Sequence, residues 1–172
     1  MKMESVITEY IDALIKFTEK NPKQNAFYRW LKENGKLFKS SDRDMEAEET
    51  ILSDMQKRGI AIRPKFCFYN SQIASIFLRS GRKLEYYEGY YVSKIPIALE
   101  HGFLVIHGKR EKLVDLTSFV AGVEVDEYFG VAIPHDYISS QIAKTSTARA
   151  ILARYFYDKI YPLQSGVIEE VI

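Results

Sequence analysis

The sequence contains little cysteine: among its 172 residues there is one, Cys67. A single thiol excludes an intramolecular disulfide, which suits a reducing compartment. The three histidines, His101, His107 and His135, do not form a Cys/His set at metal-ligand spacing, and the glycines form no phosphate-binding loop. The sequence therefore predicts neither a metal site nor a cofactor.

The sequence also lacks an excess of charge of either sign, and it lacks long apolar runs. The formal net charge is +1, so no overall field would attract nucleic acid or an acidic membrane. No window approaches the ~18 apolar residues of a membrane span, and the charged N-terminus does not resemble a signal peptide. We expect a cytoplasmic protein that has no membrane partner.

One local segment, residues 20–39, is basic and aromatic. Its cations are Lys20, Lys23, Arg29, Lys32, Lys36 and Lys39, and its aromatic residues include Phe27, Tyr28 and Trp30. This composition is compatible with a nucleic-acid-binding surface. It fits better a helix whose cations are solvated and whose aromatic residues belong to the core, so the sequence argues against a nucleic-acid partner.

The pattern of apolar residues, 47% of the chain, predicts one α+β domain. Residues 1–60 form a helical part that ends near Gly59, with the second helix running from about Asn25. Residues 61–137 form a core with a helix from Cys67 to Leu78, whose inner face would include Ala74, Phe77 and Leu78. Strands are predicted at 84–92, 102–106 and 113–117, with further short strands near 123–125 and 128–131. Residues 138–172 add C-terminal helices, including one at 148–161.

Cys67 follows Pro64 and stands at the predicted start of a helix. A helix N-terminus and a nearby imidazolium both favour a thiolate, and the helix N–H groups could stabilise an oxyanion beside the sulfur. A thiol nucleophile also needs a base, and the base needs an acceptor that orients it.

His101 and Asp115 are the predicted base and acceptor. The polar stretch from His107 to Glu111 predicts a hairpin loop centred near Gly108, which would place residue 101 directly opposite residue 115. The carboxylate could then accept a proton from the imidazole and fix its tautomer. His107 is the alternative base, although its position suggests a loop residue; His135 fits a local structural role near a helix start.

A helix-borne cysteine, then a histidine that opens a strand, then an aspartate resembles the transglutaminase-like branch of the papain-like cysteine hydrolases. The matching segments are Phe66–Asn70, His101–Phe103 and Val114–Thr117; 87–90, 128–131 and 133–134 are similar as well. The resemblance covers residues 63–137. It departs from the family pattern at Phe103, where many members have tryptophan, and Gln56 is the only upstream amide close to Cys67 that could complete an oxyanion site.

The resemblance implies a papain-like fold and cysteine-dependent acyl transfer on amide bonds of a peptide or protein. Cys67 would be the nucleophile, His101 the acid and base, and Asp115 the orienting group. Peptidase, deamidase and transamidase activities all remain open. The alternative is a catalytically inactive protein that binds a partner on the same scaffold.

Overall fold

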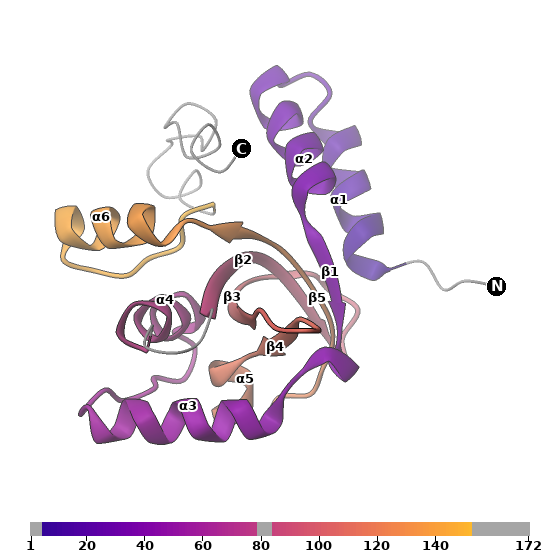
Figure 1. Ribbon diagram of the computed structural model, residues 1–172. Coiled ribbons are helices and arrows are strands. Elements are labelled where there is room, and N and C mark those ends of the chain that lie inside the picture. Colours follow the sequence, from indigo (N-terminus) through magenta and orange to yellow (C-terminus); the bar gives the residue numbers. More distant parts are fainter. Residues whose placement is uncertain (1–4, 79–83, 153–172) are drawn as a thin grey trace.

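The computed structural model describes residues 5–78 and 84–152, and its centre is a curved five-stranded sheet (Figure 1). The strands are β1 (Lys36–Lys39), β2 (Leu84–Ser93), β3 (Leu99–Ile106), β4 (Lys112–Val114) and β5 (Val125–Ile133). Their order is β1-β5-β2-β3-β4, and all neighbours are antiparallel. Together with the helices, this sheet confirms the predicted α+β class.

Three helices precede the core, as the sequence predicts. They are α1 (Val6–Phe17), α2 (Pro22–Asn34) and α3 (Met45–Lys57), capped by the side chains of Ser5, Asn21 and Asp44. After α3, Gly59 adopts a φ of 72°, the left-handed conformation expected where a helix ends. A short 3-10 turn, η1 (Ser40–Asp42), connects β1 to α3.

The aromatic residues of the basic segment belong to the core. Phe27, Tyr28 and Trp30 are all buried on α2. Three of the cations are paired with carboxylates: Lys32 with Asp12 at 2.5 Å, Lys39 with Glu127 at 2.6 Å, and Lys36 with Glu111. The packing of this segment thus accounts for its composition.

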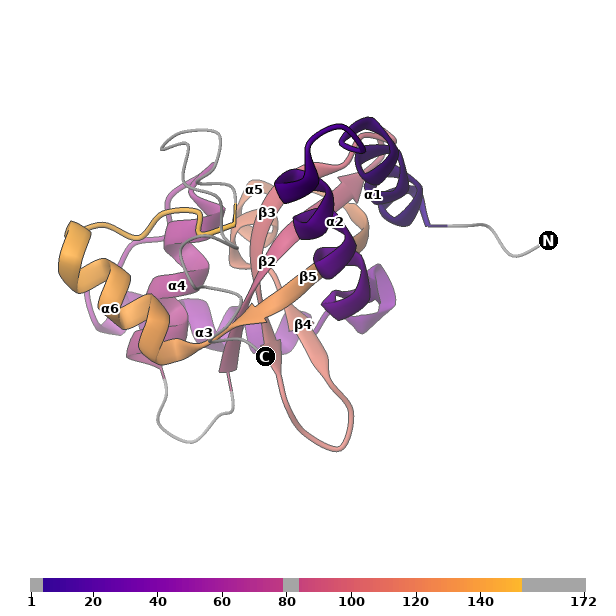
Figure 2. The same cartoon turned by 90° about the horizontal axis from the view of Figure 1, so that it is seen from above.

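The remaining helices are α4 (Cys67–Phe77), α5 (Leu116–Ala121) and α6 (His135–Thr145). Helix α4 packs on β2 and β3, whereas α1 and α2 pack on each other and contact β2 and β5. Both views place α4 and α6 side by side, away from α1 and α2 (Figures 1 and 2). The predicted inner face of α4 is correct for Ala74 and Leu78 but wrong for Phe77, which is 49% exposed.

Four sequence predictions need correction. The strand β1 was not predicted, because Lys36 and Lys39, three residues apart, read as solvated helix surface; it pairs with β5. The two short strands near 123–131 are one strand, β5. The strand predicted at 113–117 ends at Val114. Residues 148–152 are not helical, and the rest of the helix predicted at 148–161 lies outside the described residues.

Side chains that alternate along the strands divide the core between the two faces of the sheet. The larger cluster joins one face to α1, α2, α3, α4 and α6. The smaller cluster on the other face centres on Phe38, Tyr87, Phe103 and Tyr128. Within the described part of the chain, no helix combines the length and apolar character that a membrane crossing requires.

Candidate functional site

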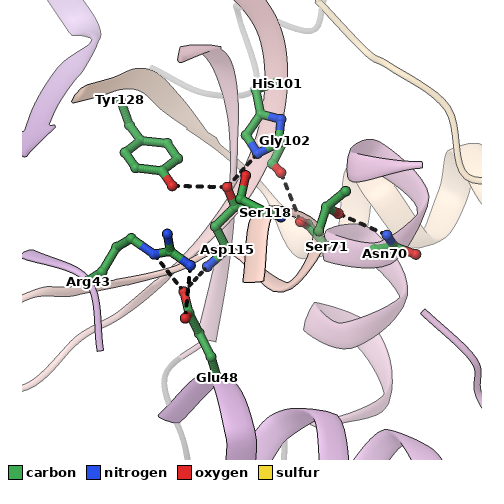
Figure 3. Close-up of polar contacts among 10 residues, drawn as sticks. Arg43, Glu48, Asn70, Ser71, His101, Gly102, Asp115, Ser118 and Tyr128 are labelled. Atoms are coloured by element: carbon green, nitrogen blue, oxygen red, sulfur yellow. Dashed lines mark hydrogen bonds and ion pairs between the residues drawn. The ribbon is translucent and has the colours of Figure 1, made fainter. Parts of the chain in front are cut away.

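Cys67 is the first residue of α4, as predicted, and two hydrogen bonds fix this end of the helix. Ser71 Oγ donates to the carbonyl of Gly102 on β3 at 3.0 Å (Figure 3), and Asn70 Nδ2 donates to Thr117 Oγ1 on α5 at 2.8 Å. Phe66, the residue before the helix, provides no side-chain cap. The Phe66 side chain therefore does not occupy the N–H groups at the start of α4, the helix end that bears Cys67.

His101 and Asp115 are in direct contact. His101 Nε2 donates to Asp115 Oδ2 at 2.9 Å, and both side chains are buried (Figure 3). The same carboxylate oxygen accepts from the Tyr128 hydroxyl at 3.0 Å, and the other oxygen accepts from the backbone N–H of Ser118 at 3.0 Å. Three donors thus fix the carboxylate, which in turn fixes the imidazole with its proton on Nε2.

The predicted pair is present, but the predicted geometry is wrong. The register of β3 and β4 pairs Leu104 with Val114, so β4 ends before it reaches His101. Asp115 is instead the N-terminal cap of α5. Its side chain turns back to accept from Ser118, and this turn brings it to the imidazole; Gly89 of β2 is the residue directly opposite His101. The contact comes from a helix cap and not from a cross-strand pair.

The charged forms of His101 and Asp115 stabilise each other. Burial acts to lower the pKa of His101, but the charge of Asp115, its hydrogen bond and a hydrogen bond with Cys67 together raise it to about 10. Burial acts to raise the pKa of Asp115, but the imidazolium and the Ser118 hydrogen bonds hold it well below its usual range. At neutral pH the pair is therefore an imidazolium and a carboxylate.

Cys67 and His101 line the same open cavity, which has a volume of about 390 Å³. Its other lining residues are Lys65, Tyr91, Leu99, Glu100, Thr117, Ser118, Ala121 and Val123. Cys67 is 9% exposed, and the ring of Tyr91 covers the imidazole at a centroid distance of 4.5 Å. Lys65 has a φ of 66°, an uncommon conformation for a residue with a side chain, two residues before the thiol. The cavity gives a ligand access to the sulfur and the imidazole together.

A second ion pair, between Arg43 and Glu48, supports the backbone of Asp115. Glu48, which is fully buried on α3, accepts two hydrogen bonds from the Arg43 guanidinium at 3.0 Å each and one from the backbone N–H of Asp115 at 2.8 Å (Figure 3). Burial raises the pKa of Glu48, and the bonds to Arg43 and Asp115 partly oppose that shift. Arg43 and Glu48 thereby hold the backbone at the start of α5.

Sequence reasoning missed Arg43, Glu48 and Tyr128. The charges of Arg43 and Glu48 are typical of a solvated helix surface, and Tyr128 lies on β5, 13 residues from Asp115, the cap of α5. No local signal identifies contacts of this range.

The other residues singled out in the sequence lie elsewhere. His107 Nε2 contacts Glu85 Oε2 at 2.6 Å in the hairpin loop, and His135 begins α6. Gln56 is exposed on α3 and does not line the cavity. Across residues 5–78 and 84–152, no three histidine, cysteine or acidic side chains are grouped so that they could hold a metal ion.

Comparisons with protein-family models, with curated proteins and with solved structures found no match to this chain.

Proposed function

We propose that the protein is a thiol enzyme that transfers the acyl group of an amide in a peptide or protein, with Cys67 as nucleophile and His101 and Asp115 as its partners. The observation that supports this most is the buried contact between His101 and Asp115 in the cavity that Cys67 lines. A nucleophile, a base and an orienting acceptor in that order constitute the minimum unit for covalent acyl transfer.

The proposal extends to the type of fold. A nucleophile helix that packs on an antiparallel sheet, with the histidine on the adjacent strand, is compatible with the transglutaminase-like arrangement. A single thiol that must stay reduced is compatible with the cytoplasm.

Acylation begins with the thiolate. Because Asp115 occupies Nε2 of His101, the proton shared with the sulfur is carried by Nδ1. The thiolate attacks the amide carbonyl, and the N–H groups at the start of α4 stabilise the oxyanion that forms. The imidazolium then gives its Nδ1 proton to the departing amine as the carbon–nitrogen bond breaks, which leaves a thioester on Cys67.

In deacylation His101 acts as the base. Neutral His101 takes a proton from water or from an amine, which attacks the thioester carbonyl. The carbon–sulfur bond breaks, and the thiolate and imidazolium are restored. Water as the acceptor gives hydrolysis of a peptide or of a side-chain amide, and an amine gives transfer. Asp115 keeps the ring oriented and stabilises its charged form throughout.

The test is the rate at which iodoacetamide alkylates Cys67 near pH 7. A free thiol with a pKa of about 8.5 is only ~3% thiolate at that pH, so a thiolate–imidazolium pair should react about tenfold or more faster. His101→Ala should return the rate to that of a free thiol, and His107→Ala, at a histidine outside the cavity, should leave it unchanged. If wild type and His101→Ala react equally slowly, the site is not a thiol enzyme and the alternative of an inactive partner-binding protein is favoured.

A further inference from the structure

Exposed apolar side chains gather around the mouth of the Cys67 cavity. Among the described residues, eleven large hydrophobic side chains are exposed, and six of them occupy three short segments beside the cavity. These six, which we call the apolar rim, are Phe66, Ile95, Ile97, Leu99, Val120 and Val123. The other five are dispersed over α1, β1, α3 and α4. A concentrated apolar surface beside a reactive cavity is typical of a binding site.

The three segments that bear the rim are far apart in the sequence and meet at the cavity. Leu99 and Val123 line the cavity, and Phe66 stands between two lining residues, Lys65 and Cys67. Lys94 Nζ contacts Glu124 Oε2 at 2.7 Å, which joins the loop that bears Ile95 and Ile97 to the segment that bears Val123. Val120 lies one residue before Ala121, another lining residue. Each of the three segments therefore contributes lining residues to the same cavity.

The edge of β3 beside this opening is unpaired. Strand β2 pairs with β3 from Leu99 to Ile106, but β4 pairs only with residues 104–106. Gly102 directs its carbonyl away from β2, toward Ser71 on α4. Backbone groups alternate between the two edges of a strand, so Glu100 directs its N–H and C=O to the same outer edge. Within residues 5–78 and 84–152 the N–H and C=O of Glu100 have no strand partner, and an extended chain could pair with them.

We propose that the substrate is an extended peptide segment with bulky apolar side chains around the reacting amide, bound by the apolar rim and by the edge of β3. This inference rests on the proposed acyl transfer at Cys67. Apolar side chains gain free energy by covering the rim, whereas a polar peptide would leave it exposed or lose its own hydration there. Lys65 and Glu100, two lining residues, have opposite signs, as do the imidazolium of His101 and the proposed thiolate of Cys67, so the cavity has no net preference for a charged substrate.

Peptidyl chloromethyl ketones test the rim separately from the thiol. In the reaction, the thiolate displaces chloride from the methylene carbon and forms a thioether, so no turnover is needed. A trileucine reagent and a triserine reagent are compared on the full chain by intact mass, and each rate is divided by the iodoacetamide rate of the same variant. We expect the trileucine reagent to react about tenfold or more faster than the triserine reagent.

Two rim variants and one control sharpen the test. Ile97→Glu and Val120→Glu place a charge at rim positions that are 57% and 47% exposed, and should lower the trileucine preference severalfold. Phe17→Glu makes the same change at an 87% exposed position on α1 and should leave the preference unchanged.

The outcomes separate the two proposals. If both reagents react equally with wild type while iodoacetamide labelling still depends on His101, the rim proposal is overturned and the thiol chemistry stands. A trileucine preference that survives both rim substitutions also overturns it. If iodoacetamide labelling does not depend on His101, the acyl-transfer proposal fails, and the rim loses its role as a substrate site.

Discussion

Two buried carboxylates, Asp115 and Glu88, differ in what surrounds them. Asp115 is fully buried and accepts from His101, Tyr128 and Ser118. Glu88 on β2 is 1% exposed and accepts from the Tyr86 hydroxyl at 2.7 Å and from the backbone N–H groups of residues 151 and 152 at 2.8 and 2.7 Å. Both side chains are buried, and both accept hydrogen bonds from a tyrosine and from backbone N–H groups.

The difference lies in the donors. One donor to Asp115 is a titratable ring that lines a cavity together with a thiol. The described donors to Glu88 are a tyrosine and backbone groups, which attach residues 151–152 to the sheet. A buried carboxylate is therefore not a functional signal by itself. It becomes one when it controls the protonation of a group that a ligand can reach.

The largest expected effect is a difference in the alkylation rate of Cys67 between variants of these two carboxylates. Asp115→Ala removes the charge that stabilises the imidazolium and should lower the alkylation rate of Cys67 at pH 7 about tenfold or more. Glu88→Gln should change that rate less than about twofold, because Glu88 does not line the cavity.

Asp115→Ala also removes a helix cap, so a matched control is required. Asp44→Ala removes the equivalent cap of α3, where the carboxylate accepts from Ala47 at 3.0 Å. It should cost about 1 kcal/mol in the free energy of unfolding and leave the alkylation rate intact. Equal loss of reactivity in Asp44→Ala and Asp115→Ala would mean that Asp115 acts only through stability.

The pH dependence of stability gives the next effect. Because the pKa of His101 is raised from 6.5 to about 10, its stabilisation is complete below about pH 6.5 and is lost as the pH rises toward 10. The difference in unfolding free energy between wild type and His101→Gln should therefore shrink over that range in urea titrations. A difference that stays flat from pH 6.5 to 10 would show that the ring is neutral in the folded protein.

Tyr128→Phe should give the smallest change in the chemistry of the site. It removes one of three donors to Asp115 and should cost about 1–3 kcal/mol, the usual range for a buried hydrogen bond to a charged group. The carboxylate left with fewer donors would hold the imidazolium more strongly, so the pH at which the His101 ring loses its proton, followed by NMR, should rise. A stability loss with an unchanged His101 titration would make Tyr128 a packing residue only.

The sequence predicted the groups of the site better than their geometry. Pro64 and the apolar pattern behind Cys67 were sufficient to predict the start of α4. The pair of His101 and Asp115 was predicted from a hairpin, but the contact depends on a cap, and the local signal for that cap was Asp115 followed by a serine three residues later. Asp115 could have continued the strand or capped the next helix, and in the structure it caps α5.

The supporting residues could not be predicted. Glu48 contacts Asp115 across 67 residues of chain, and its burial depends on Arg43, which local patterns assign to the surface. Strand β1 was missed for a similar reason, since it has four residues, begins and ends with lysine, and buries only Phe38. Long-range packing decides both cases.

The central claim is that the sulfur of Cys67 and the ring of His101 share one proton, and the ultraviolet absorbance of the thiolate measures this most directly. Absorbance is measured at pH 7 in wild type and in His101→Ala, with Cys67→Ser subtracted as background. We expect the thiolate absorbance to be present in wild type and to be lost in His101→Ala. Equal absorbance in both proteins would contradict the account.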